Sequence, residues 1–472
     1  MQKTKIPGEK TEPNTILPQE QNKHEIFDTV SSFFKDFHIG NLLKRCNALK
    51  EKGVPVLDIF KYKLCNVFAD RSMYMQMKTG SFSEGFSKNT YYRFQNDKRP
   101  NWLRFTSSLS RSVARTIEPL TSKDRINAFV IDDTLFSRTG YKRTELASSL
   151  YDHVSGTNKN GFRLLTLGWT DGNTFLPINS SLLASSNPDC VVCEKKYPEP
   201  DGRSNAAKIR KLARTKGTKA MLELIKEAVK AGYKADYVLF DSWFSSPAQL
   251  LDVKNLGFYC IAMVKKNDTK YEYDGRDLNI KEIFKASPKR RGRSKYLLSV
   301  NVNVGNEEQK IPAKIVYVRN RNNSKDWVAF ICTNPELSEE EIIRIYGKRW
   351  DIEVFFKTCK SYLKLLTECH SLSYDALTAH VAIVFTRYMM IALEQRRNSD
   401  ARTIGPLFQS LADELKDIKF SESLQIIMNT LLKCIDTVFH ITGEQVAVFT
   451  REFIEHMPEY IKKAFARVPV AS

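Results

Sequence analysis

The pattern of apolar and polar positions changes twice along the chain, dividing it into a helical beginning, a mixed middle and a helical end. In the middle part, short apolar runs bounded by turn residues predict buried strands, at 128–131, 162–169, 174–178, 237–240 and 258–264. Helical periodicity lies between the later strands, over about 206–231 with a break near Gly217, and over 247–256. The order of these elements predicts an α/β fold, with an antiparallel hairpin at one side of a mixed sheet and helical crossovers afterwards.

The hairpin is the most local of these predictions. Asp171-Gly172-Asn173 stands between two of the apolar runs. Asp, Gly and Asn adopt the backbone conformations that tight turns between antiparallel strands require. We therefore expect the second and third strands to pair directly with each other.

The remaining segments differ from this mixed part in composition and periodicity. Residues 1–22 are polar, contain three prolines and predict a flexible lead-in. Residues 23–122 show helical spacing, and residues 373–472 are helical throughout. The predicted core, 123–372, is interrupted over 265–335 by a β-rich insertion with a basic loop.

Two short helices are predicted in the first helical region, over 86–94 and from Trp102 to Val113, on either side of a polar turn. Basic side chains gather around that turn: Lys88, Arg93, Lys98, Arg99 and Arg104. The pattern is equally compatible with a DNA-contacting helical module and with an ordinary helical subdomain that exposes its charges.

Composition adds a strong charge asymmetry. The 472 residues carry a net charge of +19, while 42% of them are apolar, which indicates a folded protein rather than a disordered basic tail. Such an excess favours a polyanionic partner, nucleic acid before a membrane surface. A ribosome-associated or merely basic protein remains open.

The nine cysteines and the absence of a signal core favour a cytoplasmic location. The cysteines are scattered, odd in number and typical of a reducing compartment. Cys190 and Cys193 form a CxxC pair without a second pair at zinc spacing, so an incidental loop pair is favoured over a structural zinc site. The apolar segment 381–393 contains Arg387 and is expected to be too short to span a bilayer.

Candidate chemistry rests on carboxylates at the ends of predicted strands. Asp132 follows the first strand and Asp241 the fourth. Open α/β sheets bind ligands at the carboxyl ends of their strands. An Asp that merely begins a turn is the alternative for each position.

The third carboxylate is predicted on a helix that Ser338 and three glutamates begin. At about 100° per residue, one narrow stripe of this helix contains Tyr346, Arg349, Glu353, Lys357 and Lys360. Asp351 points the other way. The competing interpretation is a solvated helix face with ordinary ion pairs between neighbouring turns.

These residues resemble the insertion-sequence DDE transposases, in the group marked by a Tyr-Arg-Glu-Lys signature. Tyr346, Arg349, Glu353 and Lys360 match the spacing of that signature without a gap. The stretch 239–244 around Asp241 is similar to the second-Asp motif of the family. Ile131-Asp132-Asp133-Thr134 is similar to the first, although the adjacent Asp133 leaves open which of the two is the metal ligand. The resemblance covers about 125–370.

The resemblance implies a ribonuclease-H-like mixed sheet with flanking helices, a β-rich insertion, and helical N- and C-terminal regions. The implied reaction is cut-and-paste DNA transposition, in which terminal inverted repeats are cut and a 3′-hydroxyl attacks target DNA. We expect Asp132, Asp241 and Glu353 to bind two Mg²⁺ or Mn²⁺ ions, because hard ions prefer carboxylate oxygens and paired ions assist phosphodiester transfer. The residues expected to contact DNA are Tyr346, Arg349, Lys357 and Lys360.

We also expect a homo-oligomer, a dimer on double-stranded DNA, and a nucleoid-associated protein in a prokaryotic cytoplasm. Two alternatives stay open. One is a DNA-binding protein that descends from such an enzyme but no longer catalyses. The other is a metal-dependent DNA nuclease that does not transfer strands.

Overall fold

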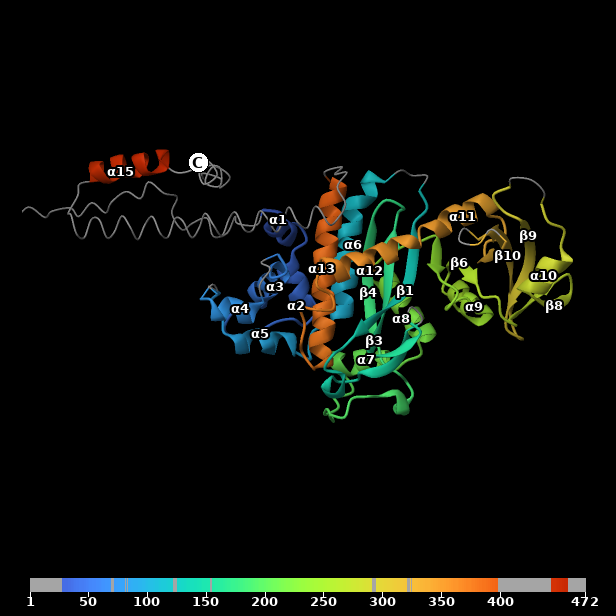
Figure 1. The fold of residues 1–472 in the computed structure, drawn as a ribbon, viewed down its shortest axis with the longest axis horizontal. Coiled ribbons are helices and arrows are strands. Elements are labelled where there is room, and N and C mark those ends of the chain that lie inside the picture. The colour runs from blue at the N-terminus through green and yellow to red at the C-terminus, as the bar shows by residue number, and fades with distance from the viewer. Residues whose placement is uncertain are drawn as a thin grey trace, which may run out of the picture. The chain divides into compact units, whose positions relative to one another are not determined.

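The computed structural model describes residues 28–68, 72–80, 82, 84–121, 125–152, 155–290, 294–320, 323, 325–397 and 443–456. The predicted lead-in, 1–22, and most of the chain beyond 397 lie outside these residues. The chain divides into two compact units. Helices α1 (Asp28–Asp36) and α15 (Gly443–Glu455) belong to one unit, and every other described element belongs to the second, larger unit (Figure 1).

One mixed sheet organises the larger unit. Its 11 described strands follow the order β2-β3-β1-β5-β6-β11-β10-β9-β7-β8, with β4 also paired to β3. In chain order the strands are β1 (Ala128–Ser137), β2 (Ser148–Asp152), β3 (Thr157–Thr170), β4 (Phe175–Leu183), β5 (Tyr237–Phe240), β6 (Tyr259–Val264), β7 (Lys270–Tyr273), β8 (Arg276–Asn279), β9 (Leu298–Gly305), β10 (Lys310–Arg319) and β11 (Trp327–Cys332). All five strands predicted for the core are present.

The strand β1 lies at the change from antiparallel to parallel pairing. It pairs antiparallel with β3 and parallel with β5, and β5 pairs parallel with β6. The predicted hairpin joins β3 to β4, and Gly172 in its turn has a φ of +88°, which a residue with a side chain rarely adopts. The predicted mixed sheet with an antiparallel hairpin at one side is therefore confirmed.

The strands of the predicted β-rich insertion continue this same sheet. Strand β11 pairs antiparallel with β6, from Ala329 opposite Val264 to Cys332 opposite Ile261. Strands β10, β9, β7 and β8 then follow, and the short helix α10 (Ile280–Ala286) accompanies them. Backbone hydrogen bonds therefore connect the insertion to β6, next to the strand that ends before Asp241.

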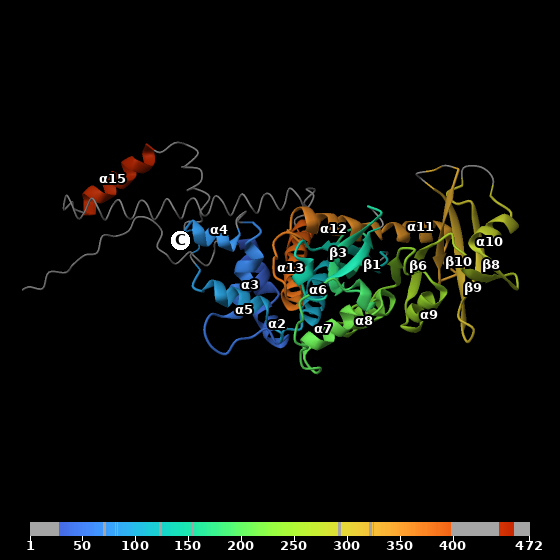
Figure 2. The ribbon, with the colours of Figure 1, turned by 60° about the horizontal axis from the view of Figure 1, so that its bottom comes forward.

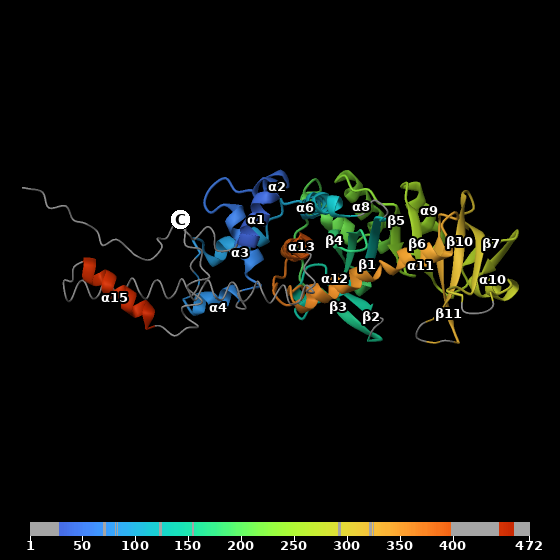
Figure 3. The ribbon, with the colours of Figure 1, turned by 90° about the horizontal axis from the view of Figure 1, so that it is seen from above.

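Helices cover both faces of the sheet (Figures 2 and 3). Helices α8 (Gly217–Lys230) and α9 (Pro247–Asn255) lie on one face, and α11 (Glu339–Gly347) and α12 (Trp350–Ser361) lie on the other. Helix α7 (Asn205–Ala213) ends before α8, so the predicted break near Gly217 is confirmed. Three short 3-10 helices complete the described elements: η2 (Glu118–Leu120), η3 (Tyr141–Arg143) and η4 (Pro188–Cys190).

The N-terminal helices of the larger unit pack against the sheet through α6 (Trp102–Ile117), which contacts β4 and the long helix α13 (Tyr374–Arg397). The others are α2 (Ile39–Arg45), α3 (Val56–Cys65), α4 (Met73–Lys78) and α5 (Lys88–Gln95). Ser87 and Asn101 cap the N-termini of α5 and α6 through side-chain oxygens that accept backbone N–H bonds. Both helices predicted around the basic turn are therefore present.

Helix α13 is longer than the sequence suggested. By length and composition it is the one helix in the described part of the chain that could cross a membrane, and 94% of its most apolar window is buried inside the protein. The expectation that this segment is too short to span a bilayer was wrong in length, because the helix extends over 24 residues. A core helix buried in this way passes the same test.

Within α13, the buried Arg387 connects α3 to the segment that follows α12. Its guanidinium donates to the backbone carbonyls of Lys63 and Leu64 at the end of α3, and to that of Leu363. It also forms a two-point ion pair with Glu368, at 2.6 and 3.0 Å. Burial raises the pKa of Glu368, but the charge and hydrogen bonds of Arg387, together with the nearby Lys63 and His380, outweigh burial and hold that pKa below its ordinary value.

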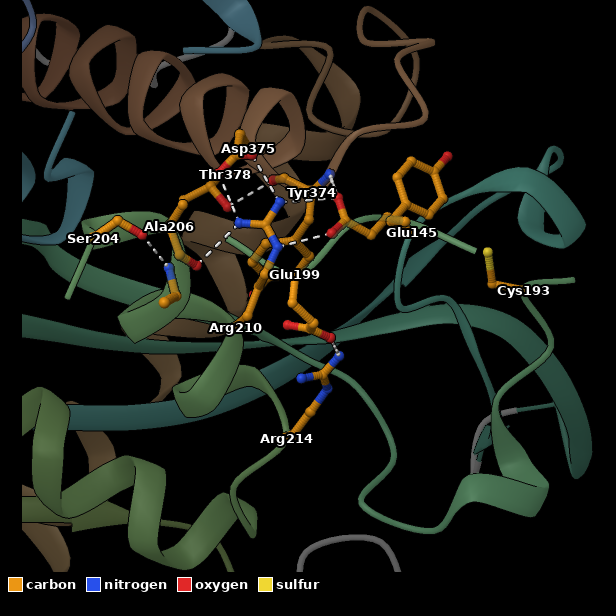
Figure 4. A network of polar contacts seen from close by, with 12 residues as sticks. Glu145, Cys193, Glu199, Ser204, Ala206, Arg210, Arg214, Tyr374, Asp375 and Thr378 are labelled. Atoms are coloured by element: carbon orange, nitrogen blue, oxygen red, sulfur yellow. Dashed lines mark hydrogen bonds and ion pairs between the residues drawn. The ribbon is translucent and has the colours of Figure 1, made fainter. Parts of the chain in front are cut away.

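A second buried ion-pair network joins α7 to the start of α13 (Figure 4). Arg210 of α7 donates to Asp375 at 2.7 and 2.9 Å and to Glu145 at 2.8 and 3.0 Å. The same Glu145 carboxylate accepts the backbone N–H of Tyr374 at 2.9 Å, and so caps α13. The Arg210 guanidinium thus supplies hydrogen bonds and a compensating positive charge to two buried carboxylates.

Candidate active site

Strands β1 and β5 place two of the predicted carboxylates side by side. Their parallel ladder ends with Ile131 opposite Phe240. The next residues along each chain are Asp132 and Asp241, on strands about 4.8 Å apart. Asp241 accepts the backbone N–H of Trp243 at 2.8 Å, which orients its carboxylate in the loop after β5.

Helix α12 brings the third carboxylate to the same place through Arg349. The guanidinium donates from Nη1 to Asp132 Oδ2 at 3.0 Å and from Nη2 to Glu353 Oε1. The three side chains are only partly exposed, at 17% for Asp132, 15% for Arg349 and 34% for Glu353. One guanidinium therefore spans carboxylates that are 221 residues apart in the sequence.

The position of Asp132 within its strand differs from the prediction. It does not end β1, which continues to Ser137, because the antiparallel partner β3 extends beyond the end of β5. Asp132 comes directly after the last residue pair of the parallel ladder between β1 and β5. What the prediction required, proximity to Asp241, is nevertheless present.

The structure separates Asp132 from its neighbour Asp133. Successive side chains of a strand point to opposite faces. Asp132 faces α12, whereas Asp133 Oδ1 accepts a bond from Arg163 Nη1 of β3 at 2.7 Å. Asp133 thus belongs to a different ion pair on the other face of β1.

The predicted single helix is broken within the signature. Helix α11 ends at Gly347, and Lys348 and Arg349 form a turn before α12 begins at Trp350. The single helix expected from the sequence is therefore wrong in its continuity, since Gly disfavours helix and Lys348 donates instead to the carbonyl of Ile126 at 2.6 Å.

The other predicted signature residues flank the carboxylates at different depths. Lys360 Nζ lies 2.5 Å from the hydroxyl of Thr134, which shares the face of β1 with Asp132. Tyr346 packs on Phe330 with ring centroids 4.5 Å apart, and burial raises the pKa of Tyr346 to about 12. Lys357 is exposed to solvent.

Burial also changes the acidity of the central carboxyl. It raises the pKa of Asp132 to about 7; the Arg349 charge lowers this pKa, and the Asp241 charge raises it. Asp132 is therefore close to half ionised at neutral pH. A pKa in this range, caused by burial and by a second carboxylate, is a feature common at functional sites.

The donor set fits a hard divalent cation. Asp132, Asp241 and Glu353 supply only carboxylate oxygens, the ligands that Mg²⁺ and Mn²⁺ prefer. Among the described residues no group of three or more His, Cys, Asp or Glu side chains is arranged to hold a metal as it stands. Arg349 bonds to two of the three carboxylates, Asp132 and Glu353.

We expect Mn²⁺ affinity to rise about tenfold per pH unit up to pH about 7 and then level off. The raised pKa means that Asp132 carries a proton below pH 7, and an ion that uses this carboxylate must displace it. Isothermal titration calorimetry with Mn²⁺ between pH 5.5 and 8.5 measures the profile. A Mn²⁺ affinity that is already constant from pH 5.5 upward, as ordinary carboxylates would give, would contradict the prediction.

Three residues beside the site were not singled out from the sequence. Thr134 contacts Lys360, while Trp243 and Trp350 are 53% and 63% exposed. Lys265 Nζ lies 4.2 Å from the Trp243 ring centroid. Their positions in the sequence could have indicated them, because each residue lies one or two places from a predicted site residue. Exposed aromatic rings beside cations are suited to stacking on bases.

Comparison with protein families identifies the superfamily of the chain. A family model described as DDE superfamily endonuclease matches residues 65–314, which is more than half of the chain and includes Asp132 and Asp241 but not Glu353. The mixed sheet with helices on both faces is consistent with a ribonuclease-H-like DDE fold. No curated protein matches the chain. The chain belongs to the DDE superfamily endonucleases.

Proposed function

We propose that this protein is a DNA transposase of the insertion-sequence type, which cuts at the ends of its element and joins them to target DNA. Family membership gives a nuclease or transposase type of enzyme with DNA as its substrate. The finer proposal is supported by the ion pairs of Arg349 with Asp132 and Glu353, by the position of Asp241 on the strand next to Asp132, and by the spacing of the signature from Tyr346 to Lys360.

The three carboxylates would hold divalent ions, Mg²⁺ or Mn²⁺. Such ions stabilise charge on the attacking and leaving oxygens of an in-line phosphodiester displacement. The protein's own part is to bring the carboxylates together on β1, β5 and α12, and to bind the DNA strand next to them.

The residues proposed to contact the strand are cationic or hydroxyl-bearing and come from α11, α12 and the turn between them: Tyr346, Arg349, Lys357 and Lys360. Backbone contacts of this kind give affinity that depends strongly on salt and little on sequence. Recognition of specific ends then has to come from elsewhere. We propose that the basic turn between α5 and α6 recognises these ends.

We further propose that the enzyme acts as a dimer on DNA in a prokaryotic cytoplasm.

The test uses purified protein, Mg²⁺ and a linear DNA that carries the sequences flanking the gene, together with a target plasmid. Joined products that a Glu353→Gln variant no longer makes are the expected result. Cleavage without joining would indicate a nuclease, and binding without cleavage an inactive descendant. Inverted repeats on either side of the coding region are a requirement of the proposal, and sequencing the flanking DNA checks it.

A further inference from the structure

Arg349 occupies an unusual place in the site. Its two terminal nitrogens bond to carboxylates from different elements, Asp132 on β1 and Glu353 on α12. Bonds between a guanidinium and ionised oxygens are about twice as strong as bonds between neutral groups. The side chain therefore acts as a shared counter-ion for two of the three proposed metal ligands.

The rest of the Arg349 guanidinium is weakly held. Its Nε is buried and has no hydrogen-bond partner among the described residues. The Tyr346 ring lies 5.9 Å from its Cζ. Arg387 differs, because carbonyls of three residues fix its guanidinium in addition to Glu368. The Tyr346 side chain also bonds to Arg349. Bonds to the two carboxylates and to Tyr346 together keep Arg349 in position, and losing the two carboxylates would leave it with the Tyr346 contact alone.

A divalent ion and this guanidinium need the same oxygens. An ion that takes oxygens of both Asp132 and Glu353 removes the acceptors of Nη1 and Nη2. It also places two positive charges beside a third in a partly buried site, where screening by water is reduced. The divalent ion and the guanidinium therefore cannot both be bound to Asp132 and Glu353 at the same time.

We propose that Arg349 competes with the divalent ion for Asp132 and Glu353, so that the metal binds only as the guanidinium leaves. This inference rests on the proposed function, since it takes both carboxylates as metal ligands. Metal entry then frees a planar fork of donors next to the ligands, and such a fork matches the oxygens of a phosphate. Arg349 serves as a positioning residue that keeps the two carboxylates paired until the ion replaces it.

The experiment measures Mn²⁺ binding to the full-length protein without DNA, by electron paramagnetic resonance of the free ion. The measurements are made at pH 8.5, so that protonation of the Asp132 carboxylate does not displace the Arg349 guanidinium from it. Arg349→Gln is expected to bind Mn²⁺ on the order of tenfold more tightly than the unchanged protein. Arg349→Lys, which keeps the charge but cannot span both carboxylates as a fork, should lie between the two.

The matched control is Lys357→Gln, which removes one positive charge from the exposed side of the same helix, one turn beyond Glu353. Each variant removes one positive charge and so weakens the general repulsion of Mn²⁺. Only the difference in Mn²⁺ affinity between Arg349→Gln and Lys357→Gln therefore reports competition for the carboxylates. Circular dichroism checks that each variant is folded. If Arg349→Gln proves misfolded, the Arg349→Lys comparison decides alone, and affinity no tighter than that of the unchanged protein overturns the proposal.

Two further variants separate this inference from the proposed function. Asp132→Asn and Glu353→Gln should each weaken Mn²⁺ binding. If they do, and Arg349→Gln binds Mn²⁺ no more tightly than Lys357→Gln does, the proposed competition is wrong, whereas the proposed metal site is supported. If neither the unchanged protein nor any variant binds Mn²⁺ at millimolar concentration, the metal site itself fails and the inference fails with it.

Discussion

Asp132→Asn is expected to reduce DNA cleavage by on the order of a thousandfold or more, whereas Asp133→Asn should leave the rate within a few-fold of the original. Asp132 faces Glu353 and Asp241, and an amide in its place supplies one neutral oxygen where a charged ligand is needed. Asp133 is bonded to Arg163 on the other face of β1. A nicking assay with labelled duplex DNA and Mg²⁺ measures both rates.

The Asp133→Asn control also tests the assignment of the first acidic residue. The two variants differ by one position, and both turn a partly buried carboxylate into an amide. If Asp133→Asn abolished cleavage and Asp132→Asn did not, the orientation of β1 described above would be wrong. Thermal unfolding of both variants shows whether a lost rate reflects chemistry or unfolding.

Arg210→Met is expected to lower the free energy of unfolding by about 3–5 kcal/mol. The substitution leaves Glu145 and Asp375 buried without the cation that both require. Although burial lowers the pKa of Arg210, its bonds to Asp375 and Glu145 outweigh burial and keep that pKa above the ordinary value. Chemical denaturation followed by circular dichroism measures the loss.

Arg214→Met is the matched control for this change. Arg214 follows the same helix and pairs with Glu199 at 3.0 Å, but its side chain is 46% exposed (Figure 4). A solvent-exposed pair of this kind contributes about 0–1 kcal/mol. If Arg210→Met and Arg214→Met lowered the free energy of unfolding equally, burial of the Arg210 network would contribute nothing to stability. Arg210→Lys, which keeps the charge without the fork, should fall between them.

The apolar runs predicted the core strands well because these strands are buried and short. Sequence could not predict the length of β1, since its last residues are held by β3, a partner whose reach depends on the folded sheet. The continuation of the sheet from β6 into β11 likewise depends on pairing between segments that are distant in the chain.

The candidate site was predictable to the extent that it is local. Arg349 and Glu353 lie four residues apart, and their spacing alone placed them on one face of a helix. The bond from Arg349 to Asp132 joins residues 217 positions apart and needed the fold. The ion pair between Asp133 and Arg163 was equally hidden, because β-strand register selects which of two adjacent acids meets α12.

Arg387 joins the N-terminal helix α3 to the segment that follows α12, the helix of Glu353. Its buried guanidinium donates directly to carbonyls at the end of α3 and in the segment after α12. If the turn between α5 and α6 recognises DNA, as proposed, this connection sets the number of base pairs between the recognised sequence and the cut phosphate. Inserting bases between the two should then displace the cut within the sequence and leave the footprint where it is.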